Sequence, residues 1–248
     1  MNASTALALP GGVTLVTPDP GAARAFYAGL LGWAYAGPAG GDPAHPGPAG
    51  GVTAYAGGTL AAELEHGAAP ARWWPVFVAA ADADAEAVRV AAGRAGARLD
   101  GRDVHDPLGG SFRVGAGTDV VTPGPGRPSW YEYMTTAPAD ADRFHADALG
   151  LRASAPPDAG DDSYALLLAA GRPVAGRLAL PPPLAALLPT GWMVYFAVAD
   201  PDAVAGRASG LGGRLLVPPR DVATGRVAAL ADPAGAVFTV IRPAPAPE

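Results

Sequence analysis

The amino-acid sequence repeats itself at one constant spacing, and this repeat constrains the fold more than any other feature. A shift of 118 residues places Thr17 on Thr135 and Phe26 on Phe144. The same shift superimposes other identical residues, namely Pro20 on Pro138, Leu31 on Leu149, Gly32 on Gly150, Trp74 on Trp192, Asp82 on Asp200, Asp84 on Asp202 and Asp103 on Asp221. The repeated unit is far longer than the roughly 20–50 residues of a solenoid repeat. The pattern therefore predicts a tandem duplication, with one module at residues 1–124 and a second at residues 125–248.

Hydrophobic periodicity predicts the same order of elements in both halves. Residues 22–31 carry apolar side chains at helical spacing, after a Thr-Pro-Asp-Pro sequence that is typical of a helix start. Residues 52–56 and 59–64 alternate around Gly57-Gly58, which predicts a β-hairpin. The expected class is α+β, with two tandem βαβββ modules that form curved mixed β-sheets and carry helices packed outside.

Composition excludes several classes of function. Half of the 248 residues are hydrophobic, the net charge is −6 and there is no cysteine. Scattered arginines form no basic face, so we expect no nucleic-acid partner. Disulfides, cysteine-zinc sites and thiol catalysis are excluded. Without an apolar run of membrane-spanning length or a secretory signal pattern, we expect a cytoplasmic protein with no membrane partner, as a monomer or a homodimer.

Several short motifs resemble the vicinal oxygen chelate superfamily, which includes glyoxalases, bleomycin-resistance proteins and extradiol dioxygenases. The motifs lie in residues 23–33 (Ala-x-x-Phe-Tyr-x-x-x-Leu-Gly-Trp), 141–151, 198–203, 221–226 and 231–238. They cover nearly the whole chain, and the resemblance implies the paired βαβββ fold. It does not imply one activity, because this fold serves isomerases, dioxygenases, epimerases and drug-sequestering proteins.

The resemblance also indicates where metal ligands would lie. The matching positions are Gly12, Trp130, Pro75, Met193, Thr239 and, in the preferred alignment of the first half, Asp119. An alternative alignment reads residues 106–109 as the Asp-Pro-x-Gly turn and puts Arg113 in place of Asp119. A divalent metal needs several converging carboxylate or imidazole ligands, which neither alignment supplies. We therefore expect no metal and no other cofactor.

The strand that contains Glu132 supplies the main candidate site. Side chains alternate along a strand, so Trp130, Glu132 and Met134 share one face. A carboxyl group between aromatic residues is a candidate catalytic acid or base, and Asp119 is the second candidate. The alternative for Glu132 is an ordinary solvated strand residue.

Further candidate ligand-binding residues come from other strands. Met193 and Tyr195 with Phe77 are expected to form an apolar wall, unless they are simply core residues, and Thr239 lies at a lost ligand position. Glu63 and Arg177 are placed at equivalent positions of the two halves, where they could clamp a zwitterion or form a salt bridge.

The sequence thus predicts a metal-independent protein that binds a small organic molecule in a cavity between its two modules, as in sequestration or resistance. The alternative is a cofactor-independent isomerase, cyclase or hydrolase that uses Glu132 or Asp119 as acid or base. A metal-dependent glyoxalase-type or dioxygenase-type enzyme ranks below both.

Overall fold

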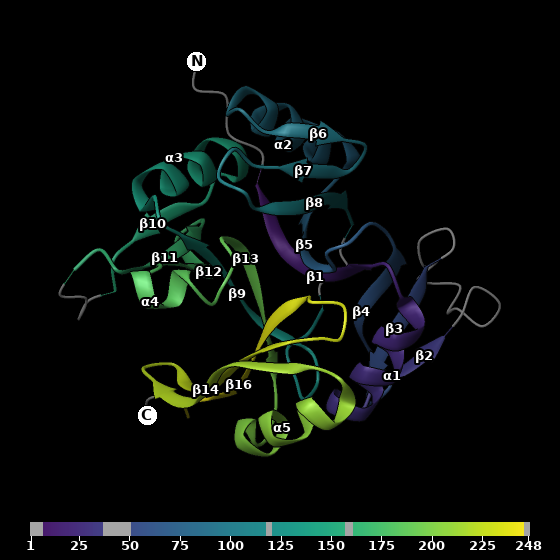
Figure 1. Ribbon diagram of the computed structural model, residues 1–248. Coiled ribbons are helices and arrows are strands. Elements are labelled where there is room, and N and C mark those ends of the chain that lie inside the picture. Colours follow the sequence, from purple (N-terminus) through teal and green to yellow (C-terminus); the bar gives the residue numbers. More distant parts are fainter. Residues whose placement is uncertain (1–6, 37–50, 118–120, 157–160, 246–248) are drawn as a thin grey trace. The chain divides into compact units, whose positions relative to one another are not determined.

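The computed structural model describes residues 7–36, 51–117, 121–156 and 161–245 (Figure 1). Within these ranges the chain forms sixteen β-strands, five α-helices and one short 3-10 helix. The α+β class is therefore confirmed. Asp119 lies outside the described residues.

The elements form four successive βαβββ segments, two in each half of the sequence, where the sequence predicted one module per half. The first contains β1 (Ala8–Thr17), α1 (Pro20–Leu31), β2 (Ala34–Ala36), β3 (Val52–Ala56) and β4 (Thr59–His66). The second contains β5 (Arg72–Ala79), α2 (Asp82–Arg94), β6 (Arg98–Asp100), β7 (Asp103–His105) and β8 (Ser111–Ala116). The third contains β9 (Pro128–Thr135), α3 (Pro138–Leu149), β10 (Arg152–Ser154), β11 (Tyr164–Ala169) and β12 (Arg172–Ala179), and is followed by the short α4 (Pro182–Ala185). The fourth contains β13 (Gly191–Ala197), α5 (Pro201–Ala208), η1 (Ser209–Leu211), β14 (Arg214–Val222), β15 (Gly225–Ala231) and β16 (Val237–Pro243).

Each segment builds its four strands in the same way. The strand orders are β2-β3-β4-β1, β6-β7-β8-β5, β10-β11-β12-β9 and β14-β15-β16-β13. In every case the first strand pairs parallel with the last, and the remaining pairs are antiparallel. The parallel pair requires a crossover, which the helix of the segment supplies. The sheets are therefore mixed, as expected.

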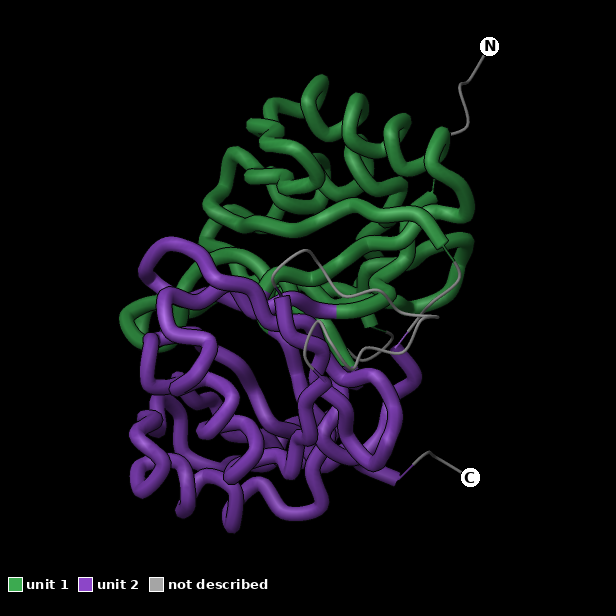
Figure 2. Tube along the Cα trace, turned by 90° about the vertical axis from the view of Figure 1, so that its right-hand side faces the viewer, with its two compact units in different colours: residues 1–12, 74–120, 130–193 green, residues 13–73, 121–129, 194–248 purple. Residues whose placement is uncertain are grey.

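The chain divides into two compact units that do not coincide with the halves of the sequence (Figure 2). Unit 1 comprises residues 1–12, 74–120 and 130–193, and so contains most of the second and third segments. Unit 2 comprises residues 13–73, 121–129 and 194–248, and so contains most of the first and fourth. The division at residue 124 thus describes the predicted duplication, not the compact units.

Aromatic side chains under the helices form the core of unit 1. Phe77 of β5 packs against Phe112 of β8 and Trp192 of β13, with ring centroids 5.4 and 5.2 Å apart. Trp192 also contacts Tyr133 of β9 and the buried His145 of α3. Phe77 is therefore a core residue, which is the alternative given for it above, and it does not belong to a ligand-facing wall.

The core of unit 2 contains residues that correspond to those in the core of unit 1. These correspondences explain why Phe77 was assigned to the wrong face of its strand. Phe196 packs against Trp73 and Phe238, with ring centroids 5.1 and 5.9 Å apart, as Phe77 packs against Trp192 and Phe112. The spacing between Phe77 and Phe196 is 119 residues, one more than the repeat found at the start of the chain. A slip of one residue moves every side chain of a strand to the opposite face.

Two identical turns correct the alignment further along the chain. Asp106 Oδ1 accepts the backbone N–H groups of residues 108 and 110 at 2.8 and 2.9 Å, and Asp232 Oδ1 accepts those of residues 234 and 236 at 2.9 and 2.8 Å. A buried tyrosine donates to the other oxygen of each, Tyr133 at 2.9 Å and Tyr27 at 3.2 Å. These turns support the alternative alignment, in which Arg113 corresponds to Thr239.

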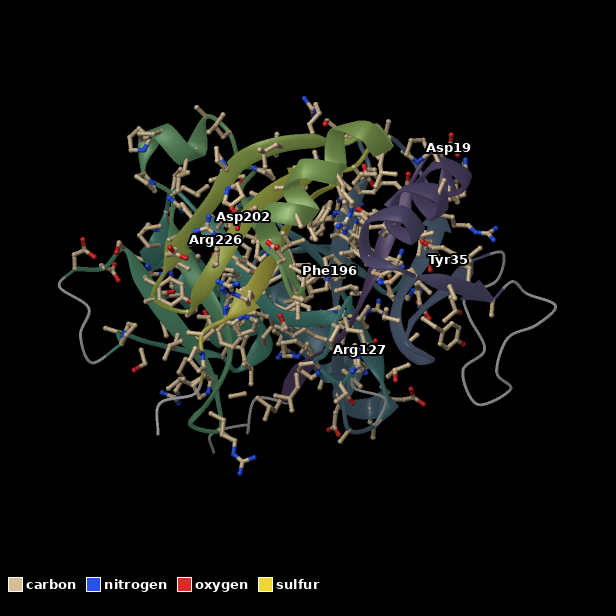
Figure 3. The ribbon with its side chains drawn as sticks, turned by 90° about the horizontal axis from the view of Figure 1, so that it is seen from below. Asp19, Tyr35, Arg127, Phe196, Asp202 and Arg226 are labelled. Carbon is tan, nitrogen blue, oxygen red and sulfur yellow. The ribbon has the colours of Figure 1, made fainter. Side chains whose placement is uncertain are left out.

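Ion pairs connect β14 and β15 of unit 2 with the helix α5. Arg226 of β15 donates to Asp202 of α5, with Nη2 2.7 Å from Oδ1, and lies 3.2 Å from Asp221 of β14. Figure 3 shows Arg226 and Asp202 next to each other. Both groups are partly exposed, so the pair positions α5 and contributes little to stability.

Candidate functional site

The strand register of unit 1 brings Glu132 into a row with two residues from neighbouring strands. Glu132 of β9 pairs with Gly176 of β12, and Gly176 pairs with Leu166 of β11. The next row consists of Met134 on β9, Leu178 on β12 and Tyr164 on β11. Paired residues point to the same side of a sheet, so both rows share one face.

Gly176 leaves a gap in this face, which the Tyr164 side chain fills. A β-carbon added to Gly176 would lie 2.2 Å from Tyr164 Oη, closer than any real contact allows. The missing side chain lets Tyr164 lean across β12 to form a hydrogen bond with the Glu132 carboxylate. Burial raises the pKa of Tyr164, and the negative charge of Glu132 raises it further. Tyr164 is therefore a neutral hydrogen-bond donor at ordinary pH.

Trp130 adds a second donor at the same place. Its Nε1 would lie 3.2 Å from the same added β-carbon on Gly176, so it points towards the Tyr164 hydroxyl. This N–H is buried beside the Tyr164 hydroxyl and lowers the pKa of that tyrosine. The Tyr164 hydroxyl is therefore flanked by the Trp130 N–H and the Glu132 carboxylate.

The rest of this face is apolar and only partly covered. Leu166 and Leu178 are half-buried, whereas their strand neighbours Ala165 and Leu167 are buried on the other side. Met134 is buried beside Glu132, which itself is only 6% exposed. Glu132, Trp130 and Met134 therefore share a face, as predicted from strand alternation. The face offers a small apolar surface with one carboxylate and two donors.

Met193 lies on this side of the sheet as well. Its neighbour Trp192 contacts Tyr133 on the helix side, with ring centroids 5.2 Å apart. Because side chains alternate along β13, Met193 points to the face of Glu132. In unit 2, Tyr195 pairs in register with the buried Thr239 of β16.

Arg177 lies on the opposite face of the sheet from Glu132. It is only 1% exposed, and Nη2 lies 3.1 Å from Asp142 Oδ2 and 2.7 Å from Asp162 Oδ1. These carboxylates, on α3 and in the loop before β11, are the partners that the sequence analysis did not identify. Arg177 therefore holds α3 and this loop against the sheet.

Glu63 does not correspond to Arg177 in the register of the strands. Glu63 of β4 pairs with Thr14 of β1, and a shift of 118 residues places Thr14 on Glu132. Since Glu132 pairs with Gly176, the counterpart of Glu63 is Gly176. The alignment that made Glu63 and Arg177 equivalent, and so a possible clamp, is therefore wrong by one residue. A shift of one residue places the two side chains on different faces of their sheets.

The positions expected for metal ligands do not fit a metal. By the corrected alignment the β5 position is Trp74 instead of Pro75, and the β8 position is Arg113. Arg113 Nε lies 2.7 Å from Asp103 Oδ1, and its guanidinium lies over the Trp74 ring at 5.3 Å. Within the described ranges, no group of three or more His, Cys, Asp or Glu side chains could hold a metal ion.

A pocket of about 660 Å³ in unit 2 is the alternative location for a ligand. Two arginines line it, and both bind backbone carbonyl groups: Arg207 Nη2 lies 3.1 Å from Leu30 O, and Arg127 Nη2 lies 3.4 Å from Pro123 O. Figure 3 labels Arg127. Arg207 supplies a positive charge at the end of α1, whose last turn has no basic residue. These contacts give both arginines a structural role.

Tyr164 and Gly176 are not among the site residues predicted from the sequence. The available signal was Gly176 itself, because glycine inside a strand often marks a place where another group approaches closely. The sequence does not show which group approaches, because Tyr164 is twelve positions away and meets Gly176 only through the pairing of β11 with β12.

Comparisons with known proteins agree with this fold. The 2,3-dioxygenase LapB from Pseudomonas sp. KL28 superimposes with a TM-score of 0.62 at 15% identity, covering 99% of this chain and 96% of that one. The Mn(II)-bound glyoxalase from Novosphingobium aromaticivorans gives 0.60 at 19% identity, with 97% and 83% covered. Residues 132–241 match the family model described as a glyoxalase-like domain. The chain belongs to the glyoxalase-like family of the vicinal oxygen chelate superfamily.

The relatives that match nearly the whole chain include the following two. "Putative glyoxylase CFP32" of Mycobacterium bovis is 32% identical over 256 residues, with 95% of each protein covered. "Anthracycline biosynthesis protein DnrV" of Streptomyces peucetius is 33% identical over 271 residues, with 94% of this chain and 92% of the relative covered. No helix in the described part of the chain is long and apolar enough to span a membrane.

Proposed function

We propose that this protein binds a planar, largely apolar organic molecule on the face of β9, β11 and β12, without a bound metal. The observation that carries the proposal is the buried Glu132 carboxylate, held by Tyr164 across Gly176 beside half-buried leucines. Pockets for small molecules combine an apolar surface with a few converging polar groups. The face of Glu132 has this composition.

The chemistry of the lost ligand positions supports binding without a metal. Trp130, Met193 and Thr239 replace the ligands in the second half, and Gly12, Trp74 and Arg113 replace them in the first. Indole, thioether, hydroxyl and guanidinium groups do not form a site for a divalent ion. The ligand would be held by shape and by hydrogen bonds to Glu132, Tyr164 and Trp130.

A relative named for anthracycline biosynthesis supports a polycyclic aromatic ligand. Trp130 and Tyr164 offer aromatic rings, and Leu166 and Leu178 offer flat apolar surface on the same side of the sheet. Such a ligand stacks on aromatic side chains and presents hydroxyl or ketone oxygens at its edge.

Titration with anthraquinone-2-sulfonate, followed by calorimetry, tests the proposed face. We expect saturable binding to the wild-type protein and a loss of at least about tenfold in affinity in Leu166→Gln. The matched control is Leu187→Gln, because Leu187 belongs to the same unit and is 53% exposed but lies in none of the three strands. Equal affinity of both variants, each with an unchanged unfolding midpoint, would contradict the proposed location.

A cofactor-independent acid–base enzyme is the second candidate, and the Tyr164–Glu132 hydrogen bond favours it. A binding protein should retain most of its affinity in Glu132→Gln, since the amide preserves shape. An enzyme that uses Glu132 for proton transfer should lose roughly 10²–10⁴-fold in turnover.

A further inference from the structure

We infer that the pocket of unit 2 is a second binding site, which takes an organic phosphate monoester through the guanidinium groups of Arg127 and Arg207. All the residues that line this pocket belong to unit 2, whereas the face of Glu132 belongs to unit 1. The two sites can therefore be tested independently.

The pocket lies where α1 ends and α5 begins. Its lining includes the last residues of α1, the turn between β3 and β4, residues 125–127 and the first turn of α5. Its volume of about 660 Å³ is within the range of small-molecule sites. Apolar residues such as Leu30, Val198 and Val204 line it and can accommodate the organic part of a ligand.

Hydrogen bonds fix the backbone that carries Arg127. Trp33 Nε1 donates to Gly126 O at 2.6 Å. The Gly126 N–H donates to Ala197 O at 2.7 Å, and the Ala197 N–H donates to Arg127 O at 3.0 Å. Gly126 has a φ of +71°, and an added β-carbon would lie 2.9 Å from Leu31 O, so this position requires glycine. Arg127 is therefore held at the wall of the pocket by neighbours from two other parts of unit 2.

Both guanidinium groups keep donors for a ligand. Their contacts to backbone carbonyl groups use only Nη2 of Arg127 and Nη2 of Arg207. No aspartate or glutamate in the described part of the chain forms an ion pair with either of them. By contrast, aspartate carboxylates bind Arg113, Arg177 and Arg226. An anionic ligand would supply the missing partner in the pocket.

The charges around the pocket match those of a phosphate monoester. Asp200 is the one carboxylate among the described residues that line it, and its Oδ1 accepts the backbone N–H groups of residues 202 and 203. This carboxylate therefore caps α5, and two guanidinium groups remain for an anion. A phosphate monoester carries about −1.5 to −2 charges at neutral pH, and guanidinium groups bind it through parallel hydrogen bonds. Two arginines suit such a dianion better than a single carboxylate.

Titration with phenyl phosphate, followed by calorimetry, tests the inference. We expect saturable binding to the wild-type protein near neutral pH, and a loss of roughly tenfold or more in affinity in Arg127→Gln and in Arg207→Gln. Arg220→Gln is the matched control, because it removes the same charge from an exposed arginine of unit 2 that does not line the pocket. Benzoate, a monoanion with the same ring, should bind roughly tenfold more weakly than phenyl phosphate.

Arg207→Lys separates binding from folding, since lysine keeps a charge and a donor for Leu30 O. It should bind phenyl phosphate more weakly than the wild type, because an ammonium group does not form two parallel hydrogen bonds.

Wild-type affinity in both glutamine variants, or no saturable binding to the wild-type protein, would overturn the site. Equal affinities for benzoate and phenyl phosphate would contradict the assignment of a phosphate ligand. Leu166→Gln should bind phenyl phosphate as the wild type does. A loss in Leu166→Gln that is absent from both arginine variants would place the anion on the face of Glu132 instead.

Discussion

Glu132 of β9 pairs with Gly176 of β12 in a parallel register. Gly176 directly precedes Arg177, so the side chains of Glu132 and Arg177 lie on opposite faces of the sheet. The two charged groups consequently have separate tasks. Arg177 binds Asp142 and Asp162 on the helix side, whereas Glu132 meets Tyr164 on the opposite side. Gly176 has no side chain and so leaves space for the Tyr164 ring, and substitution of this glycine tests its role.

Gly176→Ala should displace Tyr164 and break its hydrogen bond to Glu132. The new methyl group would lie 2.2 Å from Tyr164 Oη, so the ring must move, at a cost of about 1–3 kcal/mol in the free energy of unfolding. Gly206→Ala is the control, because this helical glycine has open space around it, and alanine should stabilise it by about 0.5–1 kcal/mol. Urea unfolding measures both. An unchanged stability of Gly176→Ala would show that Tyr164 does not occupy the gap.

Arg177→Met should destabilise the protein far more than removal of an exposed arginine. The substitution keeps the aliphatic volume but leaves Asp142 and Asp162 facing each other without a cation. Because water reaches both carboxylates, we expect the free energy of unfolding to fall by about 2–4 kcal/mol, which is at the low end of the range for removing one partner of a buried ion pair. Arg143→Met removes the exposed pair with Asp140 and should cost less than about 1 kcal/mol. Equal losses in urea unfolding would contradict the structural role of Arg177.

His145 should make the protein less stable in acid. Burial lowers the pKa of His145 from 6.5 to about 3, so the folded state keeps the ring neutral where the unfolded state takes up a proton. The stability of the fold is therefore unaffected by His145 above pH 6.5 and falls as pH drops towards 3, by about 1.4 kcal/mol per pH unit.

Unfolding in urea at a series of pH values measures this contribution. Between pH 6.5 and 3, the free energy of unfolding should fall less steeply in His145→Phe than in the wild type, by the slope that corresponds to about one proton. Substitution of the exposed His66 by Gln is the control and should leave this slope unchanged. A slope in His145→Phe equal to that of the wild type would mean that His145 is protonated in the folded protein.

Removal of metal should affect neither stability nor ligand binding. The positions where the superfamily resemblance implies ligands carry side chains that do not fit a divalent ion. Dialysis against EDTA should therefore leave the unfolding midpoint and the affinity for anthraquinone-2-sulfonate unchanged. A stoichiometric metal in the purified protein, together with a lower midpoint after its removal, would contradict metal-independent binding.

The sequence by itself determined the fold class, the duplicated arrangement of βαβββ segments and the common face of Trp130, Glu132 and Met134. These features follow from local signals, namely hydrophobic period, helix-start sequences, turn glycines and strand alternation, which act over a few residues. The family was also accessible, because its motifs are short and contiguous, as in residues 23–33.

Only the tertiary structure decided the register of the later strands and the neighbours of Glu132. The repeat spacing grows from 118 residues at Phe26 and Phe144 to 119 at Phe77 and Phe196. One inserted residue moves every following side chain of a strand to the opposite face of the sheet. The constant spacing therefore placed Phe77 on the wrong face, and the assumed equivalence of Glu63 and Arg177 did the same for Arg177. Tyr164 reaches Glu132 through pairing between three strands that are distant in the chain. Such contacts depend on which strands pair and in what register, and no local pattern in the sequence encodes them.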